Sequence, residues 1–256
     1  MNVSPDPAAE PTLPPELAEA ARRLFGPALP VATAYADLLA TDGVVRGLIG
    51  PHEAVRIWDR HLLNCAVVGE LIPTDASVVD VGAGAGLPGI VLAIARPDLT
   101  VLLVEPMARR TAFLLEAVTM LGLASRASVL RARAEELPGA ITPADVVTAR
   151  AVAPLDRLAS WCLPLAARGG RLLALKGASA AEEVITHRDE IRRLGGATPV
   201  IRRCGVGLIE PPTTVVEIVR EREAPAARAS RARGAARRSG KSTSDGRAGR
   251  GGSRTR

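Results

Sequence analysis

The spacing of apolar residues along the chain changes near residue 77. From Pro14 to about Leu71, apolar residues recur at steps of three and four, as in P-E-L-A-E-A-A-R-R-L-F, and this spacing predicts helices. From Ser77 onward, short β-rich runs such as S-V-V-D-V and T-V-L-L-V-E alternate with helical stretches. The pattern therefore predicts a small helical N-terminal region followed by an α/β region.

Seven strand-like runs follow this change, and helical stretches separate most of them. Such alternation predicts a mostly parallel, doubly wound sheet of seven strands, which is the architecture of a Rossmann-like α/β fold. The last two runs, T-P-V-I-R-R-C and T-T-V-V-E-I-V, are joined by G-V-G-L-I-E-P-P and not by a helix. We therefore expect an antiparallel hairpin at the end of the sheet.

Composition sets the boundaries of these regions. Residues 1–12 are rich in Pro and Ala, and the chain after about Ala224 is rich in Ala, Arg, Gly and Ser without periodicity. Neither stretch can bury enough apolar surface to offset the entropy lost on ordering, so we expect both to be disordered. The sequence thus predicts a disordered N-terminus at 1–12, a helical region at 13–75, a Rossmann-like domain at 76–221 and a disordered Arg-rich tail at 222–256.

The usage of cysteine, histidine and apolar residues bears on the compartment and on metal chemistry. The three cysteines lie far apart, and the three scattered histidines form no ligand spacing with them, so we expect neither a disulfide framework nor a metal site. Since no apolar run reaches the roughly 18 residues that a membrane span needs, and the start of the chain lacks the features of a signal peptide, we expect a cytoplasmic protein.

The positive charge of the chain is concentrated at its end. The net charge is +6, but from Glu221 onward eleven Arg and Lys residues stand against three acids, which leaves the first 220 residues slightly acidic. A basic tail of this kind could hold RNA phosphates through salt-sensitive contacts that do not depend on sequence. A solubilising extension without a binding role is the alternative.

The segment V-V-D-V-G-A-G-A-G-L-P-G predicts a ligand-binding turn after the first strand. Its glycines allow a sharp turn and a close approach of the backbone to a ligand, which makes Gly82 and Gly84 candidate contacts. Pro88 is well placed at the start of a helix. Glu105 ends the second strand, where a carboxylate can accept hydrogen bonds from ribose hydroxyls.

Two adenosine cofactors, S-adenosylmethionine (SAM) and NAD, fit this turn. The spacing of Gly84, Gly86 and Gly89 matches the G-x-G-x-x-G of dinucleotide enzymes, and Glu105 suits either cofactor. Asp80 favours SAM, because SAM carries a sulfonium and an amino group whereas an acid would repel the pyrophosphate of NAD. A glycine-rich turn without a ligand is the third possibility.

Several charged residues beyond the turn are candidates for contact with RNA: Arg60, His61, Arg109, Arg110 and Lys176. Arg109 and Arg110 lie in the first turn of an expected helix, where the helix dipole disfavours cations, so they indicate a phosphate or acid partner unless they form a solvated basic face. Lys176 closes the fifth strand and either faces RNA or lies on the surface. Arg60 and His61 lie on a helix and serve either its packing or a lid over the site.

Four stretches in order resemble one known family: W-D-R-H-L-L-N-C from Trp58, D-V-G-A-G-A-G-L-P-G from Asp80, E-P-M-A-R-R-T-A-F-L from Glu105, and T-A-R-A-V-A-P-L from Thr148 running on to S-W-C and A-L-K-G. The family is that of the 16S rRNA guanine-N7 methyltransferases of the RsmG type, also called glucose-inhibited division protein B. These are class I SAM-dependent methyltransferases, and the expected order of strands is typical of that class. The resemblance covers about residues 39–219.

The resemblance implies a set of binding residues. The R-H-x-x-D of the family appears here as Arg60, His61 and Asn64, so an amide replaces the acid. The cofactor-contacting positions of the family map onto Gly82, Leu87, Ala134, Glu135 and Arg150. By their residues alone, Ala134 and Glu135 equally suit a helix N-terminus, and Arg150 equally suits an ion pair with Asp145 or Glu135.

The activity that the resemblance implies is transfer of a methyl group from SAM to N7 of a guanine in 16S rRNA of the 30S subunit. Guanine N7 carries a lone pair and no proton, so the reaction needs no general base, and positioning can supply most of the catalysis. We therefore assign no catalytic residue, and we expect a monomer. The alternatives are a SAM enzyme for a small molecule or protein, an RNA-binding module without catalysis, and, through the G-x-G-x-x-G match alone, an NAD oxidoreductase.

Overall fold

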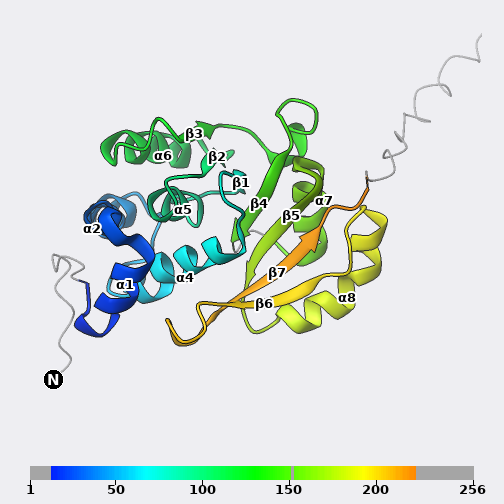
Figure 1. Cartoon of the computed structure of the whole chain (residues 1–256). Helices are drawn as coiled ribbons and strands as arrows, with labels where there is room; N and C mark the ends of the chain where they lie inside the picture. Colours follow the sequence, from blue (N-terminus) through cyan, green and yellow to red (C-terminus); the bar gives the residue numbers. More distant parts are fainter. Residues whose placement is uncertain (1–12, 151–152, 223–256) are drawn as a thin grey trace, which may run out of the picture. The chain divides into compact units, whose positions relative to one another are not determined.

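The computed structural model of the chain describes residues 13–150 and 153–222 (Figure 1). The disordered N-terminus expected at 1–12 and nearly all of the basic tail expected at 222–256 lie outside the described residues. The hypothesis that the tail binds phosphates therefore stays a prediction. Within the described residues, no helix is both long and apolar enough to cross a membrane.

A seven-stranded sheet of the order β3-β2-β1-β4-β5-β7-β6 forms the centre of the described region. Neighbouring strands from β3 to β5 run parallel, whereas β7 is antiparallel to both β5 and β6. This arrangement confirms the mostly parallel Rossmann-like sheet and its final hairpin. The strands are β1 (Ser77–Val81), β2 (Thr100–Val104), β3 (Ala127–Leu130), β4 (Ala144–Arg150), β5 (Ala166–Lys176), β6 (Val200–Cys204) and β7 (Thr213–Val219).

Helices cover both faces of the sheet, which explains why its inner strands are rich in Val and Leu. Alternate residues of β1 pack into different clusters: Val78 packs with α5 and α6, whereas Val79 packs with α7 and α8. The helices are α1 (Ala18–Phe25), α2 (Leu29–Leu38), α3 (Pro51–Ala54), α4 (Leu63–Ala66), α5 (Gly89–Ala95), α6 (Ala108–Met120), α7 (Leu155–Cys162) and α8 (Ala180–Arg193).

The N-terminal segment is helical, and it packs on the same face of the sheet as α5 and α6. Phe25, Tyr35 and Trp58 belong to the buried cluster that also holds Ile90 and Phe113. The last part of the segment in which helices were expected is divided into α3, a π-helical turn (Ile57–Leu62), α4 and a 3-10 turn (Val67–Leu71). The expected domain boundary between residues 75 and 76 falls just before β1. The N-terminal helices and the sheet region share one hydrophobic core across this boundary.

Candidate functional site

The glycine-rich turn follows β1 at the carboxyl edge of the parallel strands. Gly82, Gly84 and Gly86 all have positive φ (70°, 59° and 97°), a conformation that strains residues with a Cβ. The amide of Gly82 donates to the carbonyl of Val104, which ties the turn to the end of β2 at 2.9 Å. A Cβ placed on Gly84 would meet only the carbonyl of Gly82, at 3.7 Å. The turn therefore leaves open space beside Gly84 that a ligand can occupy.

Glu105 lies against this turn. Its side chain is buried, and its carboxylate accepts hydrogen bonds from the amides of Gly84 (3.1 Å) and Met107 (2.9 Å). A carboxylate has about four lone-pair positions, so Glu105 keeps acceptor capacity for ligand hydroxyls. The structure thus brings Gly82, Gly84 and Glu105 together, as the sequence predicted.

Arg110 has the acid partner that its position in the first turn of α6 suggested. The side chain of Arg110 is half-exposed, and its Nη1 lies 3.8 Å from Oε2 of the buried Glu105. The negative charge of this carboxylate offsets the unfavourable interaction of the arginine with the helix dipole. Arg109 is exposed, and no side-chain partner is found for it within the described residues. Contact of either arginine with RNA stays a prediction.

Both carboxylate oxygens of Asp80 are engaged within the protein, so its contacts do not support the reason for which it was taken to favour SAM. It is fully buried, and its Oδ1 accepts from the hydroxyl of Thr148 (2.9 Å) while Oδ2 accepts from the amide of Gly89 (3.0 Å). The carboxylate therefore joins β1 to β4 and to the N-terminus of α5. The sequence shows the acid but not its distant partner on β4.

Replacing Asp80 by asparagine is expected to change how stability depends on pH. Burial raises the pKa of Asp80 from 3.8 to about 6, although hydrogen bonds from Thr148 and Gly89 oppose the shift. The unfolded chain loses this proton at lower pH than the folded protein does. The contribution of Asp80 to the free energy of unfolding therefore falls as the pH rises from about 4 to 6, by about 3 kcal/mol at most.

The amide of the D80N variant does not titrate, yet it can accept from Gly89 and donate to Thr148. Urea unfolding between about pH 4 and 7 should therefore show the variant gaining stability relative to the wild type as the pH rises. If the difference in the free energy of unfolding between D80N and the wild type stays constant over this pH range, the pKa of Asp80 is not raised.

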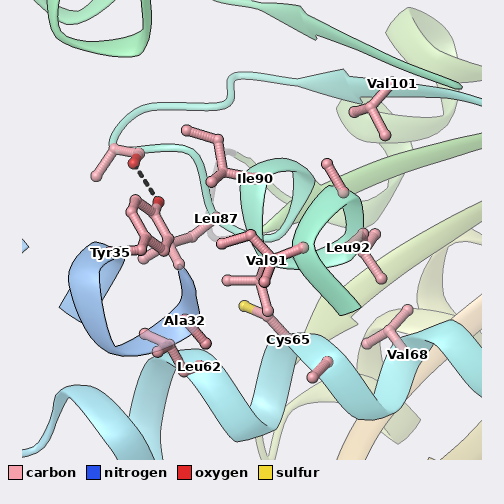
Figure 2. Close-up of a cluster of buried hydrophobic side chains, with 14 of the residues drawn as sticks. Ala32, Tyr35, Leu62, Cys65, Val68, Leu87, Ile90, Val91, Leu92 and Val101 are labelled. Atoms are coloured by element: carbon pink, nitrogen blue, oxygen red, sulfur yellow. Dashed lines mark hydrogen bonds between the residues drawn. The ribbon is translucent and has the colours of Figure 1, made fainter. Parts of the chain in front are cut away.

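Tyr35, which the sequence pattern did not single out, supports the turn from the N-terminal helices. Its buried hydroxyl donates to the carbonyl of Ala85 at 2.6 Å, as Figure 2 shows, with the side chains of Leu87 and Ile90 beside the ring. A Cβ on Gly86 would lie 2.7 Å from this hydroxyl and 2.5 Å from Ile90 Cδ1, so this glycine is required for the close approach. Tyr35 is the one tyrosine of the chain, and it lies in an apolar helical stretch. Because a buried tyrosine hydroxyl needs a hydrogen-bond partner, this residue could have been singled out from the sequence.

The remaining cofactor candidates lie in different surroundings. The side chain of Leu87 is 9% exposed and packs in the core of Figure 2. Ala134 and Glu135 begin a 3-10 turn (Ala134–Glu136) beyond β3, where Ala134 is buried in the cluster that includes Val104 at the end of β2, and Glu135 is exposed. Their contacts with a cofactor stay predictions.

Arg150 pairs with the N-terminal helical segment, and neither of the two acids proposed from the sequence is its partner. Its guanidinium contacts His61 Nδ1 (2.6 Å), Cys65 Sγ (3.0 Å) and the carbonyl of Arg60 (3.2 Å). Asp145 instead accepts from the amide and the hydroxyl of Ser77. The π-helical turn at Ile57–Leu62 thus presents the ring of His61 and the carbonyl of Arg60 to the end of β4.

Arg150 and the glycine turn are neighbours at the edge of the sheet. Ala149 on β4 pairs with Val81 on β1, so Arg150 and Gly82 follow paired residues on adjacent parallel strands. Neighbouring strands lie about 5 Å apart, and the two residues leave the sheet side by side. Ligands in open α/β sheets bind outside this carboxyl edge.

A cleft of about 770 Å³ opens beside Arg150, between the N-terminal helices and the loop that joins β6 to β7. Basic side chains outnumber acidic ones in its lining, which includes Arg56, Arg60, Arg150, Lys176 and Arg203 together with Asp59 and Glu210. Lys176 is held by Glu183 (2.7 Å) and by the carbonyl of Ala153 (2.9 Å), with only 10% of its side chain exposed. Its ammonium is therefore engaged within the protein.

The position occupied by an acid in R-H-x-x-D is filled by Asn64 on the wall of this cleft. Its Oδ1 accepts from the hydroxyl of Thr213 at 2.9 Å, and its Nδ2 donates to the carbonyl of Arg60 at 3.2 Å. The amide thus links α4 to the start of β7. Compared with an acid at this position, Asn64 carries no negative charge, and its Oδ1 still accepts the hydrogen bond from Thr213.

Comparisons with known proteins show which sequences and folds the chain is similar to. The profile of the family described as "GidB: rRNA small subunit methyltransferase G" matches residues 29–207. A protein named ribosomal RNA small subunit methyltransferase G from Salinispora tropica is 66% identical over 89% of this chain and 97% of its own length. A protein of the same name from Corynebacterium efficiens is 53% identical over 82% of this chain and 91% of its own length.

Among solved structures, a candidate S-adenosyl-L-methionine-dependent methyltransferase from Methanococcus maripaludis has a similar fold. The TM-score is 0.52 at 13% identity, and the match covers 74% of this chain and 94% of that protein. At this identity the likeness concerns the fold alone.

Proposed function

Because the chain belongs to the family of rRNA small subunit methyltransferases G, we propose that it transfers a methyl group from SAM to N7 of a guanine in 16S rRNA of the 30S subunit. SAM supplies an electrophilic methyl group on a sulfonium. The family membership removes the NAD oxidoreductase from consideration, which had rested on glycine spacing alone. Since the substrate is ribosomal, we place the protein in the cytoplasm, where we expect it to act as a monomer.

The observation that carries the cofactor assignment is the open space at Gly84 beside the buried carboxylate of Glu105. A turn of positive-φ glycines lets a ligand approach the backbone, and Glu105 retains lone pairs for the ribose hydroxyls of an adenosine. Gly82 borders the same turn, and Ala134 is buried in the cluster that holds the end of β2. We assign Gly82, Leu87, Ala134, Glu135 and Arg150 as further contacts because the family places them there.

The cleft beside Arg150 suits the target nucleotide. Its volume of about 770 Å³ lies within the range of small-molecule sites, and its surplus of basic side chains suits phosphates. A guanine held in a helix would have to leave the base stack to enter it. Since N7 has no proton to lose, what the residues of the cleft must do is hold the base in line with the methyl group.

The test is to incubate the protein with labelled SAM and either 30S subunits, naked 16S rRNA or a metabolite extract. We expect label in 16S rRNA, and cleavage of the product at N7-methylguanine should locate one modified base. Comparing rRNA from cells with and without the gene gives the same result in vivo. Label that appears only in small molecules or protein would contradict the proposal, and SAM binding without transfer would indicate an RNA-binding module.

A further inference from the structure

Three side chains form a continuous line of contacts that ends at Arg150, in the lining of the cleft. Glu53 comes from α3, His61 from the π-helical turn, and Arg150 from the end of β4. His61 Nδ1 lies 2.6 Å from Arg150 Nη2, and Glu53 Oε2 lies 3.0 Å from His61 Nε2, close enough for an electrostatic contact although Nε2 has no hydrogen-bond partner among the described residues. The chain thus brings together residues that are up to 97 positions apart, counted from 53 to 150.

The contact with Arg150 fixes the protonation state of His61. A guanidinium has only donors, so Nδ1 must offer its lone pair, and the proton of a neutral imidazole then sits on Nε2, facing Glu53. Burial and the charge of Arg150 lower the pKa of His61 to about 4, against the opposing effect of Glu53. The other charged group that faces the ring is Arg60, which lowers the pKa further. His61 is therefore neutral near pH 7.

The guanidinium of Arg150 is held on more than one side. In addition to His61, it donates to Cys65 Sγ and to the carbonyl of Arg60. These bonds use three of its five N–H groups, which leaves donors free at a place in the cleft wall set by the protein. A donor that is oriented before its ligand arrives loses little freedom on binding.

We propose that His61 is a positioning residue: the nearby carboxylate of Glu53 favours a proton on Nε2, and the unprotonated Nδ1 orients Arg150 at the border between the glycine turn and the nucleotide in the cleft. The assignment rests on the proposed function for the identity of that nucleotide. It explains why a histidine that has a carboxylate neighbour is nevertheless uncharged. It also assigns His61 and Glu53 to the support of the site and not to contact with RNA.

Two substitutions of His61 separate its two ring nitrogens. In His61→Asn the amide oxygen can take the place of Nδ1 and still accept from Arg150, whereas in His61→Gln the longer amide reaches the place of Nε2 and faces Glu53. We expect His61→Asn to keep kcat/KM for 30S subunits within a few-fold of the wild type. We expect His61→Gln to lower it by about 10- to 100-fold, because a guanidinium displaced by about 1 Å misplaces the substrate.

Thermal unfolding of both variants gives the control for a merely structural role. If His61 only stabilises the packing, the loss of activity will follow the loss of Tm, and the two variants will not differ in kcat/KM at equal Tm. That outcome would overturn the proposal. A His187→Asn variant serves as the matched control, since His187 lies on α8 with its Nε2 3.9 Å from Asp156, outside the cleft lining. It should keep wild-type kcat/KM.

A second measurement does not need the enzymatic reaction. Nitrogen-15 NMR of the imidazole rings in the full chain near pH 7 should show His61 with an unprotonated Nδ1 and a protonated Nε2. A proton on Nδ1, or a charged ring, would overturn the positioning role. Wild-type protein that transfers no methyl group to 30S subunits would contradict the proposed function and would leave the NMR result to decide the tautomer.

Discussion

Replacing Gly84 by asparagine is expected to lower the affinity for SAM by about 100-fold or more, which corresponds to about 3 kcal/mol of binding free energy. The new side chain would project into the space beside the glycine turn, where only the carbonyl of Gly82 lies within 4 Å of a Cβ. Since no other part of the described chain clashes with the new side chain, we expect the substitution to weaken ligand binding and to change the stability of the fold little. Asparagine tolerates the positive φ of this position better than most residues.

Calorimetric titration with SAM measures the affinity, and Gly122→Asn is the matched control for backbone strain. Gly122 has a φ of 66° close to that of Gly84, and no atom lies within 4 Å of its Cβ position, but it follows α6 away from the turn. Both variants should lose a similar and small amount of stability, and only Gly84→Asn should lose SAM affinity. Unchanged affinity in Gly84→Asn would place the cofactor elsewhere.

Replacing Gly89 by alanine is expected to destabilise the protein by about 1–3 kcal/mol through overpacking. A Cβ at this position would lie 2.3 Å from Leu103 Cδ2, 2.7 Å from Asp80 Oδ2 and 2.9 Å from Asp80 Cβ. The methyl group of Leu103 can move, but the carboxylate of Asp80 is held by Thr148 and by the amide of residue 89 itself. The helix α5 must therefore shift away from β1, and the glycine turn shifts with it.

Urea denaturation measures this loss, and Gly50→Ala is the control because its Cβ would make only an ordinary contact, 3.8 Å from Glu53 Cγ. At a backbone position that alanine can adopt, the substitution removes freedom from the unfolded chain and gains about 0.4–1 kcal/mol. We expect Gly89→Ala also to weaken SAM binding in proportion to the shift of the turn. A Gly89→Ala protein as stable as the wild type would show that α5 moves without cost.

Much of the architecture is local in origin and could be predicted. Val-rich and Leu-rich runs bounded by turn residues specify β1 to β5, and the absence of a helical stretch between the last two runs specifies the hairpin of β6 and β7. The glycine turn and Glu105 were also predictable, since both follow directly from a strand end. In a parallel sheet the ends of neighbouring strands meet at one edge.

The partners of the buried polar groups were not predictable. Asp80 was read as an acid facing a cation, but it bonds to Thr148, 68 residues away. The alternative partners considered for Arg150 were nearby acids, but it contacts His61, 89 residues earlier. Tyr35 was overlooked because the carbonyl that it binds lies 50 residues further along the chain. Periodicity shows which side of an element is buried, but not which element covers it.

The amino-acid sequence by itself determined the strands, the glycine turn and, through its motifs, the family of methyltransferases to which the chain belongs. These features depend on residues that are close together in the chain or in one ordered series. The tertiary structure alone decided that Asp80 is structural, that Lys176 is engaged by Glu183, and that Arg150 is held by the N-terminal helices. A buried charged group forms hydrogen bonds with whichever polar group lies within about 3 Å of it. The packing of the whole fold decides which group that is.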